Sequence, residues 1–313
     1  MSRLIELVLL LALVALVAWP VRRTGEKFLV RWGIARPTRA QSEAAARYLR
    51  HRRMLYPICW VFGPALVLLV AELAGDSAMS EARRTFGLLA SVLAALLLAE
   101  LVAILRPARG STRSATLSRR RWSDLVPWWA IAVYGVLLVT AALLATAGLV
   151  AHSWAVRSVA AAAADPGNHT DPVSTGQLVS TTGNWLDLLG VALGLAAVGA
   201  VLWLAASRRA EADPEVDRIL RVRTARVAVG VGIGLALGLV NHGYQHISEL
   251  HNLIPSILYG TGAAPLAPPE PGVVTLAAHL DGLGMIVLLF ASLGAWLAVA
   301  IPPSGPLTPA PIP

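Results

Sequence analysis

Long apolar runs, separated by segments rich in arginine, constrain this chain more than any other feature. Several runs reach the roughly 20 helical residues that cross a hydrocarbon core. Only 14% of the residues are charged, against about 25% in an average soluble domain, and the mean hydropathy is +0.65. The sequence therefore predicts an all-α, polytopic membrane protein with no separate soluble domain.

We expect a bundle of about seven transmembrane helices in a single membrane domain, residues 1–301. The expected spans cover residues 4–21, 54–74, 85–105, 125–151, 187–207, 227–247 and 280–301. The last apolar run already begins at residue 273 and is longer than a bilayer needs, so its first residues are expected to stand outside the membrane. The proline-rich tail, residues 302–313, cannot form a packed core and is expected to be disordered.

The distribution of basic residues predicts the orientation of these helices. Residues 22–53, 106–124 and 208–226 together hold 22 of the 26 Lys and Arg residues. Cytoplasmic loops carry such an excess, so the N-terminus is expected outside and the C-terminus inside. The preference for Arg over Lys and the abundance of Ala are associated with GC-rich genomes. We therefore expect a multi-pass protein of a bacterial plasma (inner) membrane.

Charge and single residues exclude several classes of function. The net charge of +8 would suggest nucleic acid on a soluble protein, but here the arginines lie between apolar spans and no nucleic-acid motif accompanies them. The expected partners are the lipid bilayer and anionic lipid headgroups at the Arg-rich loops, unless those loops serve only as a topology signal. Cys59 is the only cysteine, so no internal disulfide forms. Lys27, the only lysine, lies in a basic loop, which excludes a retinal Schiff base within a helix.

Local patterns predict helix starts and interfacial segments. Thr38 and Gln41 have the spacing of a capping box, which predicts a helix start. The sequence Asp-Pro-Glu at 213–215 is typical of a second helix start, because proline fits the first turn and acidic side chains are favourable at a helix N-terminus. Residues 26–34 are expected to dip their apolar side chains into the membrane interface. Residues 251–259 are too short to cross and are expected to lie in the interface.

The candidate functional residues are histidines and acids at the outer rim of the expected bundle. On a helix, His242, His246 and Glu249 fall within an arc of about 60°. Two histidines spaced His-x-x-x-His can share a metal, and a carboxylate on the same face can be the third ligand. His279 and Asp187 are weaker candidates at a similar depth. An open fourth position would allow water activation.

Glycines on two of the expected spans predict a close helix contact. They are Gly190 and Gly194 on one span and the stripe Gly230, Gly234 and Gly238 on the next. Small residues let helices approach closely. A contact through these glycines, on the helix face that carries the histidines, would bring Asp187 toward His242.

Three explanations of this outer cluster remain open. Polar residues at helix ends often contact headgroups or cap the helix, and glycine stripes often serve packing alone. The cluster could instead hold a divalent metal or haem, or it could form a proton or ion path. Our leading hypothesis is a protein that acts as a scaffold or handles a small solute or ion. The alternative is a metal- or haem-dependent membrane enzyme, so enzymatic activity stays open.

Glu100 is the one acid well inside an expected span. Burying its charge costs about 2.5–3.5 kcal/mol on insertion scales, so we expect it to be protonated or paired with an arginine. Its role would be either that structural pair or a proton relay.

Overall fold

The part of the chain that the structure describes is helical. The computed structural model describes residues 22–52, 55, 93, 96–102, 125–164, 181–207, 213–261, 268–279 and 283–300. Its labelled helices are α2 (Arg22–Arg31), α6 (Trp128–Ala163), α7 (Thr182–Ser207), α8 (Pro214–Thr261), α9 (Gly272–His279) and α10 (Leu283–Ala300). Residues 39–52 and 96–102 are helical too. These ranges contain no strand, which agrees with the predicted all-α class.

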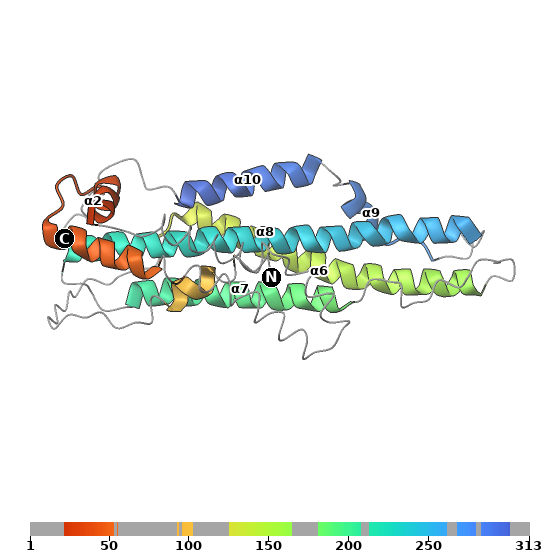
Figure 1. Cartoon of the computed structure of the whole chain (residues 1–313). Helices are drawn as coiled ribbons and strands as arrows, with labels where there is room; N and C mark the ends of the chain where they lie inside the picture. Colours follow the sequence, from red (N-terminus) through yellow and green to blue (C-terminus); the bar gives the residue numbers. More distant parts are fainter. Residues whose placement is uncertain are drawn as a thin grey trace, which may run out of the picture.

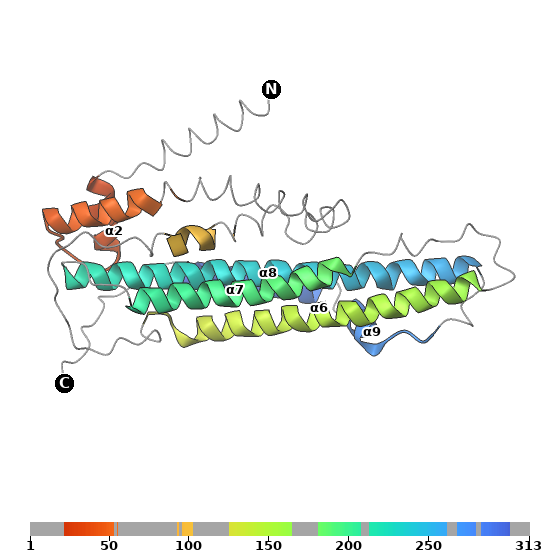
Figure 2. The same ribbon diagram turned by 90° about the horizontal axis from the view of Figure 1, so that it is seen from below.

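Three long helices, α6, α7 and α8, lie side by side and form the body of the molecule (Figure 1 and Figure 2). Tyr134 of α6 lies against Gly232 of α8, and Leu144 lies against Gly243, so α6 and α8 run in the same direction. The end of α7 lies beside the start of α8, so α7 runs in the opposite direction (Figure 1). The shorter α10 packs along α8 on another side.

The three long helices are apolar and long enough to cross a membrane. At about 1.5 Å per residue, the 48 residues of α8 extend about 72 Å, more than twice the ~30 Å hydrocarbon core. Large apolar side chains are exposed on α6, α7 and α10, among them Val136, Leu143, Leu193 and Phe290. Three helices that each expose several large apolar side chains are unusual on a soluble monomer. These faces therefore fit contact with lipid.

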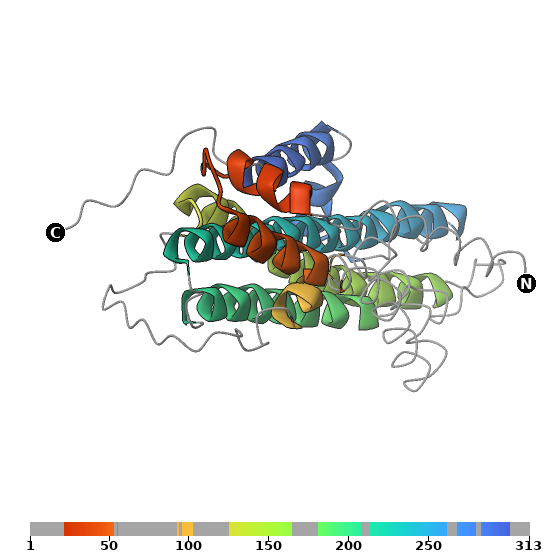
Figure 3. The same cartoon turned by 60° about the vertical axis from the view of Figure 1, so that its left-hand side comes forward.

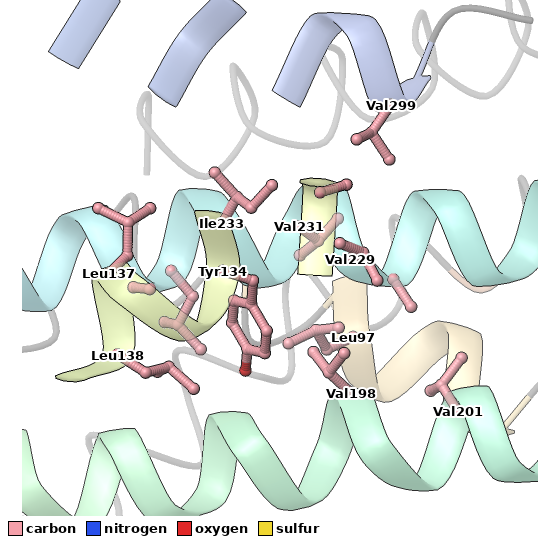
Figure 4. Packing of buried hydrophobic residues seen from close by; sticks show 14 of the residues in the cluster. Leu97, Tyr134, Leu137, Leu138, Val198, Val201, Val229, Val231, Ile233 and Val299 are labelled. Atoms are coloured by element: carbon pink, nitrogen blue, oxygen red, sulfur yellow. The ribbon is translucent and has the colours of Figure 1, made fainter. Parts of the chain in front are cut away.

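The central core fills the space between α6, α7 and α8 (Figure 4). A side chain on Gly232 would meet Val198 at 2.8 Å and the Tyr134 ring at 3.0 Å, so this position requires glycine for the helices to approach. Gly234 faces Leu93 instead. Gly238 has nothing within 4 Å of its Cβ position among the described neighbours. The close approach of α6 and α7 to α8 thus lies at Gly232, off the predicted stripe, and the packing of the stripe as one face stays a prediction.

At one end of the bundle, α2 and residues 39–52 pack against the start of α8 (Figure 3). We call this the basic end. Leu29 and Trp32 are buried there against Ile219 and Leu220 of α8. The expectation that the apolar residues of 26–34 dip into the membrane interface is therefore wrong for these side chains. Their apolar face has a protein partner, and burial inside the protein removes it from lipid and water alike.

Both predicted helix starts are present at the basic end. The Thr38 backbone N–H donates to Oε1 of Gln41 at 2.9 Å, and the Gln41 backbone N–H donates to Oγ1 of Thr38 at 3.3 Å, which is a reciprocal capping box. Oδ1 of Asp213 accepts from the backbone N–H groups of Glu215 and Val216. The Gln41 amide also donates to Oδ2 of Asp213 at 2.7 Å, so the two helix starts hold each other.

The structure differs from the expected boundaries at the opposite end. Residues 251–261 continue α8 as one helix, so the separate interfacial segment expected at 251–259 is not formed. That end of α8 packs on Trp154 and neighbouring alanines of α6, which gives its apolar face a partner. The run expected as one helix from 273 to 301 forms α9 and α10, with residues 280–282 outside the described residues.

The seven-span topology stays a prediction. The expected spans at 187–207 and 227–247 lie within α7 and α8, and the one at 125–151 overlaps α6, which begins at Trp128 and continues to Ala163. The described apolar stretch of α10, Phe290–Val299, is shorter. The span at 4–21 and the tail at 302–313 lie outside the described residues. The span at 54–74 is described only at residue 55, and the one at 85–105 only at residues 93 and 96–102.

Candidate functional site

Apart from the Asp217–Arg221 pair, the described residues include two groups of buried polar side chains between the helices, one toward each end of the bundle. The first, which we call the Arg52 network, consists of Tyr48, Arg52, Glu100 and Thr224. Nη2 of Arg52 lies 2.7 Å from Oε2 of Glu100, and both side chains are almost fully buried. From the sequence, Glu100 is expected to be either protonated or paired with an arginine. In the structure it is paired with Arg52.

Every member of the Arg52 network is held by more than one contact. Nη2 of Arg52 also donates to Oγ1 of Thr224 at 2.8 Å. That hydroxyl in turn donates to the carbonyl of Leu220 and lies 2.8 Å from the Tyr48 hydroxyl. The Arg52 guanidinium stacks over the Tyr48 ring, 4.1 Å from its centroid. These contacts compensate for the loss of water around a buried ion pair.

A second arginine closes the end of α7. Nη1 of Arg221 donates to the carbonyls of Ala205 and Ala206 at 3.0 and 2.9 Å. These carbonyls belong to the last turn of α7, where no helical N–H follows to bond them. Nε of Arg221 donates to Asp217 at 2.7 Å, at the i,i+4 spacing that the sequence shows. The basic end is therefore fixed by charged side chains that serve packing and capping.

The second polar group, the Asp187 cluster, consists of Asn184, Asp187, His242 and His246. Nδ1 of His242 lies 2.8 Å from Oδ2 of Asp187, and the side chains are 13% and 1% exposed. One turn farther along α8, Nε2 of His246 lies 3.1 Å from Nδ2 of Asn184. The approach of Asp187 to His242 is the one that the sequence predicts.

The periodicity of α7 places the acid and the amide on one face. Asn184 and Asp187 are separated by three residues, and the buried positions Gly190 and Gly194 continue the same stripe. Since α7 and α8 are antiparallel, this stripe meets successive turns of α8. Asp187 thus reaches His242, and Asn184 reaches His246.

Gly148 of α6 forms the third wall of the cluster. A side chain at this position would overlap Oδ1 of Asn184, so only glycine leaves room for the amide. That buried oxygen, like Oδ1 of Asp187, has no hydrogen-bond partner among the residues that the structure describes. A buried acceptor without a partner costs about 1–3 kcal/mol.

The other predicted site residues lie apart from this cluster. Glu249 is exposed on α8. His279 is exposed on α9, and its Nδ1 lies 2.6 Å from the Thr275 carbonyl of its own helix. His251 pairs with Glu270 at 2.5 Å.

The predicted metal site has no third ligand in the described ranges. No group of three or more His, Cys, Asp or Glu side chains there could hold a metal ion. His242 and His246 instead hydrogen-bond to Asp187 and Asn184 of α7. A divalent metal or haem at the outer rim stays a prediction.

Sequence reasoning missed Asn184, Gly148 and Arg52. The signal for Asn184 was its position three residues before Asp187, on the face that carries the glycines. Arg52 is one of ten basic residues in the segment 22–53, and no pattern singles it out.

Comparisons with protein-family models, with curated proteins and with solved structures find no match for the chain. A proposal about its function therefore rests on the geometry of its own residues.

Proposed function

We propose that this chain is an integral membrane protein that takes up and passes a proton at the Asp187 cluster. This specifies the ion-handling function predicted from the sequence. The observation that supports it is the buried Asp187–His242 pair, whose second carboxylate oxygen has no partner among the described residues. Ionisable groups within membrane helices are expensive to bury, and they often mark proton or ion paths.

His242 and Asp187 differ in how far their side chains are exposed. The His242 side chain is 13% exposed, whereas that of Asp187 is 1% exposed. A proton that binds Nε2 of the imidazole allows the Nδ1 proton to move along the 2.8 Å contact to Oδ2 of Asp187. The net result is one proton on the carboxyl group and a neutral imidazole. Histidine suits this exchange because its charge changes near neutral pH.

Asn184 and His246 extend the polar surface by one turn. Their 3.1 Å contact lies beside the Asp187–His242 pair on the same two helices. The amide oxygen of Asn184 and the second carboxylate oxygen of Asp187 are further buried acceptors without a partner among the described residues.

The setting that we propose is a plasma membrane crossed by seven helices. The apolar faces of α6, α7 and α10 would contact the lipid bilayer. The basic end would face the cytoplasm and bind anionic headgroups. The Lys and Arg residues gathered in segments 22–53 and 208–226 support this last point, because clusters of basic residues at the cytoplasmic ends of membrane helices attract anionic lipids.

Purified protein in liposomes with an enclosed pH dye and an imposed membrane potential tests the proposal. We expect native protein to acidify the lumen and Asp187→Asn to lower the rate at least about tenfold, since the amide cannot carry the proton. Glu249→Gln is the matched control, because it removes an exposed carboxylate from α8. Native protein that moves no more protons than empty liposomes would contradict the proposal and favour a scaffold.

The same preparation tests the metal or haem alternative. If native protein carries a stoichiometric metal or shows a haem absorption band, the His242→Ala, His246→Ala double variant is expected to lose it. That result would favour the metal or haem site over the proton site.

A further inference from the structure

The two contacts of the Asp187 cluster lie one helical turn apart on both α7 and α8. Asn184 precedes Asp187 by three residues, and His246 follows His242 by four. Because the helices are antiparallel, the contacts Asp187–His242 and Asn184–His246 form two successive links between them. One link alone would let α7 turn or slide against α8. Two links on successive turns oppose both movements.

The hydrogen-bond roles of the two histidines differ. Nδ1 of His242 faces a carboxylate oxygen of Asp187, so this nitrogen donates, and the contact is kept whether the imidazole is neutral or charged. Nε2 of His246 faces the amide nitrogen of Asn184, which can only donate. That Nε2 must therefore accept, and it can accept only in a neutral imidazole. The first contact is compatible with proton transfer, whereas the second requires His246 to stay uncharged.

Asn184 is also confined by α6. Its side chain is fully buried, and Gly148 of α6 leaves the space that the amide occupies. Near this level α6 also approaches α8 closely, since a side chain on Gly243 would meet Cβ of Leu144 at 3.1 Å. The amide therefore lies between α6 and α8 and has little room to turn away from His246.

We propose that Asn184 is a positioning residue of the proton site, and that His246 is its hydrogen-bond acceptor and not a second proton carrier. This inference rests on the proposed proton transfer at Asp187. A slip of α7 by one residue shifts its side chains by about 1.5 Å along the axis and about 100° around it. Such a slip would break the 2.8 Å contact between Asp187 and His242. Misplacement of reacting groups by about 1 Å can lower a rate about a hundredfold.

Proton uptake into liposomes tests the role of Asn184. We expect Asn184→Ala to lower the rate about tenfold or more, because α7 loses one of its two links to α8. Val201→Ala is the matched control, since it also truncates a fully buried side chain of α7 but lies about 25 Å farther along the helix. The control should keep the native rate even if thermal unfolding shows that both variants lose the same stability.

Substitution of His246 separates positioning from proton transfer. The side chain in His246→Gln keeps an acceptor for the Asn184 amide but cannot carry a proton, so we expect a rate within about threefold of the native one. The side chain in His246→Leu has no acceptor, and this variant should be slowed as much as Asn184→Ala. Thermal unfolding of each variant establishes that the compared proteins are folded.

The results that would overturn this inference differ from those that bear on the proton site itself. A native rate in Asn184→Ala or His246→Leu, or an equal loss in Asn184→Ala and Val201→Ala, would remove the positioning role and leave Asp187 as the proton site. A His246→Gln protein as inactive as Asp187→Asn would show that His246 carries a proton. Native protein without proton uptake would overturn both the proposed function and this inference.

Discussion

The Arg52 network and the Asp187 cluster are both buried polar groups between helices, but they differ in how far their hydrogen-bonding capacity is filled. In the network, the Arg52–Glu100 ion pair is backed by a hydroxyl from α8 and by a tyrosine ring. In the cluster, Asn184 and Asp187 each keep one buried oxygen without a partner among the described residues. The first arrangement is complete, and the second leaves acceptors open.

This difference separates structural charge from functional charge. A saturated ion pair has no vacant position for a proton or ligand, so its removal damages the fold. A buried pair in which one oxygen lacks a hydrogen-bond partner is less stable than a fully bonded one. Such losses of stability are typical of functional sites. On this comparison we propose that Glu100 serves as a structural pair with Arg52, whereas Asp187 is the candidate for proton transfer.

The largest effect is expected in the Arg52 network. Glu100→Ala leaves the Arg52 guanidinium buried without its counter-ion, which typically costs about 3–5 kcal/mol. Denaturation of the purified protein in mixed micelles measures the free energy of unfolding. The double variant Arg52→Met, Glu100→Leu is the control, because an apolar pair of similar volume is often neutral. A Glu100→Ala protein as stable as the native one would break the comparison.

A smaller loss is expected at Gly148. Gly148→Ala places a methyl group on the Asn184 amide, which must move away from His246, and overpacking of this kind costs about 1–3 kcal/mol. Gly135→Ala on the same helix has open space and should instead stabilise by about 0.5–1 kcal/mol. If Gly148→Ala lowers the free energy of unfolding and Gly135→Ala raises it in the same assay, the close approach of α6 to Asn184 lies at Gly148. Equal effects of the two substitutions would count against the tight Gly148–Asn184 contact.

Asp187→Asn is expected to change stability still less while it removes proton transfer. The amide keeps an acceptor for His242, and interhelical hydrogen bonds in membranes contribute about 0.6 kcal/mol on average and at most about 1.7 kcal/mol. Unfolding in micelles and proton uptake in liposomes should therefore separate. A loss of stability as large as that of Glu100→Ala would place Asp187 among the structural charges.

The sequence predicted those parts of the molecule that depend on local patterns. The capping box at Thr38 and the helix start at Asp213 follow from side chains that bond to their own backbone. The approach of Asp187 to His242 followed from helical periodicity on two neighbouring helices, so two one-dimensional patterns predicted one three-dimensional contact.

The features that the sequence did not predict depend on which element covers a given face. The apolar side of residues 26–34 fits either lipid or protein, and only the position of α8 decides between them. Residues 251–259 suggest an interfacial segment until α6 is seen to extend alongside them. Gly148 matters because Asn184, 36 positions later, lies against it, and no local signal marks that pairing.

The smallest effect is expected from substitution of Glu249. This substitution tests whether Glu249 belongs to the same site as Asp187, His242 and His246. Glu249 is exposed, and substitutions at such positions usually change stability by less than about 0.5 kcal/mol. Glu249→Gln should therefore leave both unfolding and proton uptake unchanged. If Glu249 were instead the third ligand of a metal with His242 and His246, the substitution would weaken metal binding and change the metal content of the purified protein. The Glu249 carboxylate is required only by the metal site. If Glu249→Gln keeps native proton uptake and Asp187→Asn loses it, the function lies at the Asp187–His242 contact between α7 and α8.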